Sequence, residues 1–150
     1  MKKNLYTLMA FLFLCMQAPQ AFSQGESKDK LVGQWTLQYN PSASKMAADL
    51  KQQFNALSLE KRNNIKKAYK GRTYAFYQDG SYKQIQADGR STTGNWSLNK
   101  NELQMIDKNG GVLKFRILSF INSRLVIKAK EKGESKQFLS QWYLTKLKKN

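Results

Sequence analysis

From residue 72 onward, short turn signals divide the chain into segments in which apolar and polar residues alternate. Asp79-Gly80 and Asp88-Gly89 each lie between two such segments, which is the strongest short-range signal of a β-hairpin. Further turn-forming stretches lie at 99–101, 108–111, 122–123 and 132–135. Because short connections force neighbouring strands to be antiparallel, this part of the chain predicts a meander.

The meander contains seven expected strands. They span residues 72–78, 81–86, 92–98, 102–107, 112–120, 124–131 and 137–147. Residues 31–39 predict an eighth, because Trp35, Leu37 and Tyr39 alternate with polar residues. We therefore expect an all-β fold, an eight-stranded antiparallel up-and-down barrel, over residues 31–147. The alternative is a two-sheet sandwich, which calls for long crossover connections that the sequence lacks after residue 72.

Between the first two strands lies the helical stretch. Met46, Leu50, Phe54 and Leu57 recur at helical spacing, and Ser58 can cap a second helix that runs to residue 70. Gly71 follows, where a helix C-terminal glycine belongs. The pattern predicts a helical hairpin inserted between strands 1 and 2, with Pro41 ending the first strand.

The first 23 residues have the features of a signal peptide. Lys2 and Lys3 precede an apolar run at 5–16 that is too short to span a bilayer, and Ala21-Phe22-Ser23 offers a cleavage site. We expect cleavage after Ser23, a disordered lead-in at 24–30, and a periplasmic or secreted protein. An uncleaved membrane anchor is the alternative. Lipid attachment at Cys15 is disfavoured by the large residues that precede it.

The chain is strongly basic, with a formal net charge of +16. Loss of Lys2 and Lys3 with the signal lowers this to +14, so the surface attracts anions. Export makes nucleic acid the least favoured anion, and we expect no nucleic-acid partner. The candidate anionic-surface residues are Lys61, Arg62, Lys66, Lys67, Lys70, Lys128 and Lys130. They form either a solvated face or a docking site for an anionic membrane surface.

The composition disfavours catalysis and metal binding. There is no histidine, and the one cysteine, Cys15, lies in the expected signal segment. The usual ligands of zinc and the usual base of a serine nucleophile are therefore missing. Asp79 and Asp88 are explained as turn residues. We expect no metal, no cofactor and no enzyme, with a pair of carboxylates brought together in space as the remaining catalytic alternative.

Large apolar residues on the strands share one face and predict the barrel interior. The candidate ligand-binding residues are Trp35, Leu37, Tyr74, Phe76, Tyr82, Trp96, Met105, Phe115 and Trp142. An eight-stranded barrel is wide enough either to be filled by its side chains or to hold one small ligand. The same residues therefore fit a packed core or an apolar pocket with Tyr hydroxyls as polar groups.

Several motifs together resemble bacterial lipocalin-like proteins of the calycin superfamily. They are Gly33-Gln34-Trp35, the run Tyr74-Ala75-Phe76-Tyr77-Gln78-Asp79-Gly80-Ser81-Tyr82, Gly94-Asn95-Trp96-Ser97-Leu98 followed by Leu103, and Trp142-Tyr143-Leu144-Thr145-Lys146. The resemblance implies a barrel that carries a small apolar or amphipathic ligand, such as a lipid. The helical hairpin resembles the lid of fatty-acid-binding proteins and would cover one mouth of the barrel.

The chain also departs from the lipocalin pattern. Almost nothing follows the last strand, where lipocalins carry a helix. Lipocalins often stack a late arginine over the tryptophan of the G-x-W motif, but no arginine follows Arg124 here, so a lysine such as Lys146 would take its place. We expect an exported, monomeric binding protein. The alternative is a module with a solid core, whose basic surface docks an acidic protein, a glycan or an anionic membrane.

Overall fold

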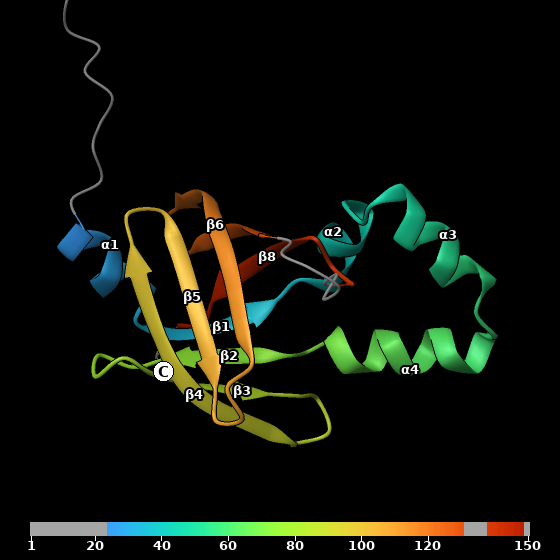
Figure 1. Cartoon of the computed structure of the whole chain (residues 1–150), viewed down its shortest axis with the longest axis horizontal. Coiled ribbons are helices and arrows are strands. Elements are labelled where there is room, and N and C mark those ends of the chain that lie inside the picture. Colours follow the sequence, from blue (N-terminus) through green and yellow to red (C-terminus); the bar gives the residue numbers. More distant parts are fainter. Residues whose placement is uncertain (1–23, 131–137, 149–150) are drawn as a thin grey trace, which may run out of the picture.

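The chain forms a closed barrel of antiparallel strands with helices at its two ends (Figure 1). The computed structural model describes residues 24–130 and 138–148. The expected signal peptide, residues 1–23, and the start of the expected last strand lie outside the described residues.

Eight strands make up the barrel. They are β1 Gly33–Leu37, β2 Thr73–Phe76, β3 Ser81–Ile85, β4 Ser91–Asn99, β5 Glu102–Asp107, β6 Val112–Ile121, β7 Arg124–Ala129 and β8 Gln141–Lys146. Each strand pairs with its neighbours in sequence, and β1 pairs with β8. This confirms the predicted antiparallel up-and-down barrel in place of the sandwich.

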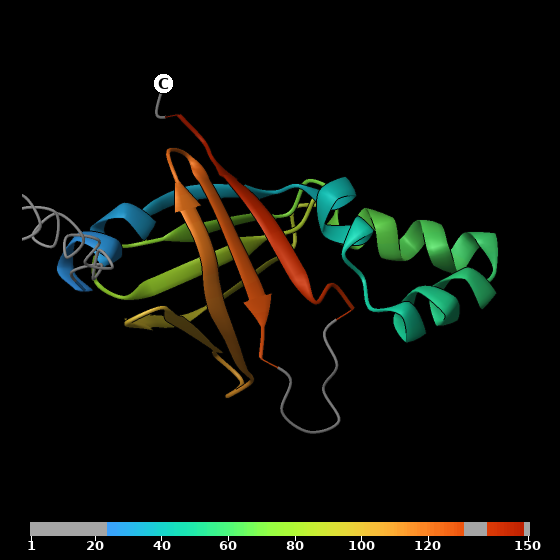
Figure 2. The same ribbon diagram turned by 90° about the horizontal axis from the view of Figure 1, so that it is seen from above.

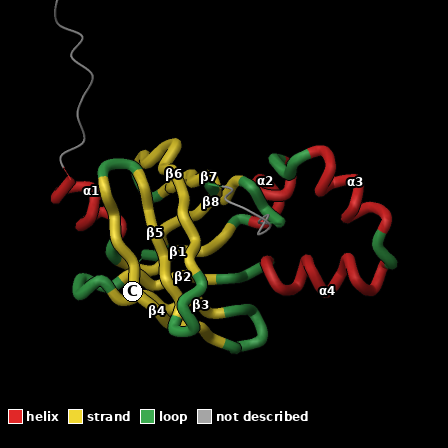
Figure 3. Tube along the Cα trace, in the orientation of Figure 1, coloured by secondary structure: helices red, strands yellow, loops and turns green. Residues whose placement is uncertain are grey.

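Four helices lie outside the barrel wall (Figure 3). They are α1 Gln24–Leu31, α2 Tyr39–Ser44, α3 Ala48–Ala56 and α4 Leu59–Tyr69. The predicted insert between strands 1 and 2 is confirmed, but it holds three helices, and Pro41 lies inside α2. Ser58 caps α4 as predicted, its Oγ accepting from the Lys61 N–H at 3.3 Å. None of the described helices is both long and apolar enough to cross a membrane.

Residues 24–30, which we expected to be a disordered lead-in, instead belong to helix α1. The helix ends on Leu31, whose side chain is fully buried in the core cluster. The indole N–H of Trp35 donates to the Leu31 carbonyl at 2.8 Å. The expectation was wrong because a polar composition conceals this single apolar anchor, which only the folded barrel can bury.

The turns at Asp79-Gly80 and Asp88-Gly89 are longer than the two-residue loops that the sequence predicted. The Tyr77 N–H donates to the Ser81 carbonyl, so three residues lie between them, and Gly80 has a φ of +85°. The Asp79 carboxylate accepts from the Ser81 N–H at 2.8 Å. This side-chain bond stabilises a tight turn that ends on a left-handed glycine. Asp88-Gly89 repeats the arrangement.

The barrel end beside α1 is closed by Gly33, Trp35 and Lys146. The Lys146 ammonium lies 5.3 Å from the centre of the Trp35 ring and donates to the Lys30 carbonyl at 2.7 Å. Gly33 has a φ of +129°, and a Cβ there would lie 2.8 Å from the Lys146 Cε. The expectation that Lys146 takes the place of an arginine over this tryptophan is confirmed.

We predict that Lys146→Met lowers the free energy of unfolding by about 1–2 kcal/mol. The change removes the cation over Trp35 and the hydrogen bond to Lys30, while it keeps an apolar stem of similar length. Urea denaturation followed by tryptophan fluorescence measures the loss. Lys148→Met is the matched control at an exposed position, with an expected change below about 0.5 kcal/mol. Equal effects of the two variants would contradict the role given to Lys146.

Candidate functional site

The barrel end opposite α1 differs from the closed end. It carries the insert α2–α4, the turns at 87–89 and 108–110, and the start of β8 (Figure 2). We call this end the mouth. Two of the connections at the mouth are short turns, whereas the connection between β1 and β2 is the long helical insert. The mouth therefore carries the largest addition to the barrel among the described residues.

All nine predicted ligand-binding residues lie in one buried cluster inside the barrel. Each is at most 4% exposed. Aromatic rings are in direct contact, with Phe115 and Trp142 centred 4.6 Å apart and Tyr74 and Trp142 centred 5.4 Å apart. The prediction that these residues share the interior is confirmed, and their role in binding stays a prediction.

Two polar side chains also face the interior near the mouth. The register pairs Tyr74 with Gln84, and Gln84 with Thr92, and such partners lie on the same face of a sheet. Since Tyr74 is interior, Gln84 and Thr92 face inward as well, and both are half-buried. Water therefore reaches the inner wall here. Sequence reasoning missed this pair, although their period-2 spacing from Tyr82 and Trp96 was a usable signal.

The Tyr74 hydroxyl is the most unusual polar group in the interior. Its side chain is buried, and its O–H meets no hydrogen-bond acceptor among the described residues. The nearby Arg72 side chain carries only donors. Burial raises the pKa of Tyr74 above its ordinary value, and the positive charge of Arg72 partly opposes this rise. A buried hydroxyl without a partner costs about 1–3 kcal/mol. The hydroxyl can therefore donate one further hydrogen bond to an acceptor that the described residues do not supply.

Arg72 precedes β2 at the mouth and is held from two sides. Its Nε donates to the Ala68 carbonyl at 3.0 Å, and its guanidinium lies 4.4 Å from the centre of the Tyr69 ring. Both contacts come from the last turn of α4, so the helix orients the guanidinium. The sequence analysis did not single out Arg72, because in the chain it is one basic residue among many.

The insert lies at the mouth, as the lid resemblance implied, but it does not lie flat over it. The α2 helix packs along β8, where the buried Ser42 hydroxyl accepts from the Tyr143 N–H at 3.0 Å. Figures 1 and 2 show α3 and α4 projecting away from the barrel. Phe138 contacts both, with ring centres 5.3 Å from Phe54 and 5.9 Å from Tyr69. These aromatic contacts hold the two projecting helices to the start of β8.

The predicted anionic-surface residues do not form one surface. Those at α4 that are exposed are Lys61, Lys66, Lys67 and Lys70. Arg62 is half-buried, and its Nε has no partner among the described residues, so it is less accessible than its neighbours, and its role on an anionic surface stays a prediction. Lys128 and Lys130 are exposed on the barrel wall, away from the projecting α4, and Lys130 pairs with Glu102.

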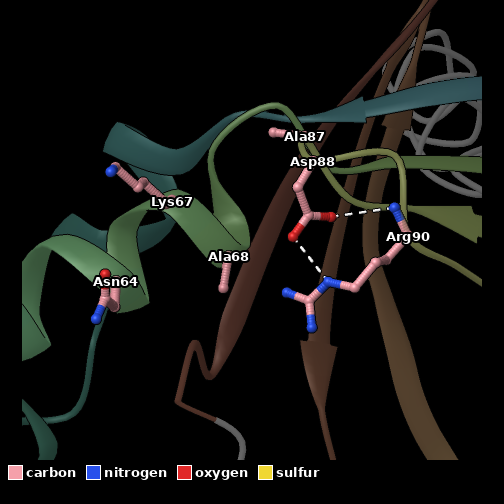
Figure 4. A pocket seen from close by; sticks show the side chains of 6 residues that line it. All are labelled: Asn64, Lys67, Ala68, Ala87, Asp88 and Arg90. Atoms are coloured by element: carbon pink, nitrogen blue, oxygen red, sulfur yellow. Dashed lines mark hydrogen bonds and ion pairs between the residues drawn. The ribbon is translucent and has the colours of Figure 1, made fainter.

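A hollow of about 430 Å³ lies between α4 and the turn that joins β3 and β4. The residues that line it are Asn64, Lys67, Ala68, Ala87, Asp88 and Arg90 (Figure 4). The Asp88 carboxylate accepts from the Arg90 N–H at 3.1 Å and from its Nε at 2.7 Å, and these bonds lower the pKa of Asp88. The hollow is open to solvent, and it lies outside the barrel, apart from the nine candidate ligand-binding residues.

Three aspartates stabilise turns of the barrel. Asp79 and Asp88 accept backbone hydrogen bonds within their turns, as predicted, and Asp107 does the same for the 108–110 turn, where it accepts from Asn109 and Gly111. In the part of the chain that the structure describes, no group of three or more His, Cys, Asp or Glu side chains could hold a metal ion.

A comparison with protein families finds that the model of the lipocalin-like domain matches residues 31–127. The match begins at the end of α1, includes the Gly33-Gln34-Trp35 motif and the insert, and ends within β7. Comparisons with curated proteins and with solved structures found no match. The matched span is more than half of the chain and coincides with a closed eight-stranded barrel, so the protein belongs to the lipocalin-like family.

Proposed function

We propose that this protein binds a small hydrophobic or amphipathic molecule through the mouth of its barrel. One observation carries the proposal. The inner wall at the mouth combines buried aromatic side chains with the inward-facing and half-buried Gln84 and Thr92. Ligand sites are mostly apolar with a few polar groups that orient the ligand, and this wall has that composition. A lipocalin-like barrel fits the same general role.

The asymmetry of the two ends supports the same proposal. At the α1 end, the Lys146 ammonium and the buried Leu31 cover the rings of the interior. At the mouth, Leu113 faces inward opposite Met105 and is only half-buried. A molecule that enters from the mouth would therefore contact the apolar side chain of Leu113 first. At the opposite end, Lys146 and Leu31 would limit how deeply it enters.

We predict that Thr92→Trp weakens ligand binding about tenfold or more, because the indole fills the inner wall at the mouth. The measurement is saturable fluorescence of the neutral dye N-phenyl-1-naphthylamine on the protein without residues 1–23. The matched control is Thr93→Trp, which places the same ring on the exposed outer face of β4. Absence of saturable dye binding to the unchanged protein, or equal loss in both variants, would contradict the proposal.

A second function is favoured by one feature of the outer wall. Arg116 of β6 lies directly opposite Lys128 of β7, and both are exposed. The backbone of Lys130 donates to the Lys114 carbonyl, so Lys114 also adjoins this pair. The one acidic neighbour among the described residues is Glu102, which lies opposite Arg116 and pairs with Lys130. Like charges directly opposite one another destabilise a sheet. A bound anionic surface would offset this repulsion, so the wall suits docking to an anionic membrane.

We predict that the double variant Arg116→Gln/Lys128→Gln binds vesicles of phosphatidylglycerol at least about tenfold more weakly, at roughly 1 kcal/mol per lost charge. Vesicle co-sedimentation at low and at physiological salt measures the change. Lys66→Gln/Lys67→Gln removes the same charge from α4 and serves as the control. Equal losses in the two variants would show a diffuse charge effect and would remove the assignment to this wall.

We further propose that residues 1–23 direct export and are then removed. The support is the pair Lys2 and Lys3, the apolar run at 5–16, and the small residues Ala21 and Ser23. Expression of the full chain in a bacterium, followed by intact-mass measurement of the protein, is expected to give an N-terminus at Gln24. A protein that retains Met1, or one that carries lipid at Cys15, would contradict the proposal.

A further inference from the structure

We infer that the mouth recognises the ionised carboxylate of an amphipathic ligand, held by the guanidinium of Arg72 and the hydroxyl of Tyr74. The inference rests on the proposed binding function and adds the chemical class of the ligand. It follows from one unpaired buried donor, one oriented cation beside it, and an apolar wall below them.

The Tyr74 hydroxyl differs from the three indole N–H groups of the core, which are all paired. The indole N–H of Trp35 donates to Leu31, that of Trp96 to Tyr77 and that of Trp142 to Leu139, each to a backbone carbonyl. The Tyr74 hydroxyl has no such partner among the described residues, although its side chain is only 1% exposed. Buried polar groups are nearly always hydrogen-bonded, and an exception calls for an explanation. A ligand oxygen supplies the missing acceptor.

The cation is already in place for this acceptor. Arg72 lies two residues before Tyr74, and its positive charge opposes part of the rise in the Tyr74 pKa that burial causes. The contacts with the Ala68 carbonyl and the Tyr69 ring engage Nε and one face of the guanidinium. The edge that carries the terminal nitrogens is the part that binds carboxylates bidentately. The side chain is half-buried, so it is reached from the mouth.

The donor set favours a carboxylate over a neutral head group. A guanidinium has only donors, and a phenol hydroxyl beside it donates to any anion that the guanidinium holds. An alcohol would satisfy one of these donors and leave the charge without a counter-ion. The rings of Phe76 and Trp142 lie beside the Tyr74 ring, with ring centres 6.5 and 5.4 Å away. These apolar rings can contact the alkyl chain of the ligand.

The test compares two ligands that differ only in the head group. Dodecanoic acid and dodecan-1-ol displace N-phenyl-1-naphthylamine from the protein at pH 8, where the acid is ionised. The acid is expected to bind about tenfold or more tightly than the alcohol, since charge-assisted hydrogen bonds are roughly twice as strong as neutral ones. Arg72→Gln is expected to abolish this preference, because it weakens binding of the acid far more than binding of the alcohol.

Two further variants separate recognition from structure. Arg90→Gln removes an equal charge at the same end of the barrel, and it is expected to keep the preference for the acid. Tyr74→Phe is expected to weaken binding of the acid about three- to tenfold. The same variant is expected to raise the urea midpoint of the ligand-free protein or leave it unchanged, because it removes an unpaired buried hydroxyl. A merely structural role for Tyr74 would instead lower the midpoint and weaken both ligands equally.

The outcomes distinguish the inference from the function on which it rests. Dye binding with equal displacement by the acid and the alcohol would overturn carboxylate recognition and leave the carrier function standing. Loss of acid preference in Arg90→Gln as well as in Arg72→Gln would also overturn it, because general charge would then explain the preference. Absence of dye binding to the unchanged protein would overturn both.

Discussion

The pairing of β1 with β8 is the contact on which the rest of the structure depends. It joins the first and the last strand of the barrel and places Trp35 between Tyr74 on one side and Lys146 on the other. With this pairing, the meander has no free edge and its apolar faces enclose a common interior. An open sheet would leave the rings of the core cluster in water, at a cost of about 1.5–3 kcal/mol for each large side chain.

Closure also makes the two ends of the barrel chemically different. At one end, Lys146 crosses the Trp35 ring above a glycine and bonds to the last turn of α1. At the other end, Tyr69 and Arg72 lie next to the buried Tyr74 hydroxyl, whose proton meets no acceptor within 24–130 and 138–148. At the α1 end, the polar groups named above are paired. At the mouth, the described residues include the Tyr74 hydroxyl without an acceptor and the inward-facing Gln84 and Thr92. The proposed recognition of a ligand is therefore assigned to the mouth.

The basic charge of the chain is divided among separate places. The lysines of α4 project beyond the barrel, the pair Arg116 and Lys128 lies on its wall, and Arg72 and Lys146 act at its two ends. A net charge alone indicates only an attraction to anions. The surroundings of each cation decide whether it stacks on a ring, repels a neighbour or faces the mouth.

The amino-acid sequence by itself determined the local features: the strands from period-2 alternation, the turns from Asp-Gly pairs, the α4 cap at Ser58, and the aromatic residues that share the interior. It also indicated Lys146 over Trp35, through the G-x-W resemblance. Only the tertiary structure decided four other features: the folding of 24–30 into α1, the third helix of the insert, the half-burial of Arg62 and the proximity of Arg72 to Tyr74. The physical reason is that alternation and turn chemistry act between neighbours in the chain. Burial, the loss of a hydrogen-bond partner and the proximity of a cation depend on segments that meet only when the barrel has closed.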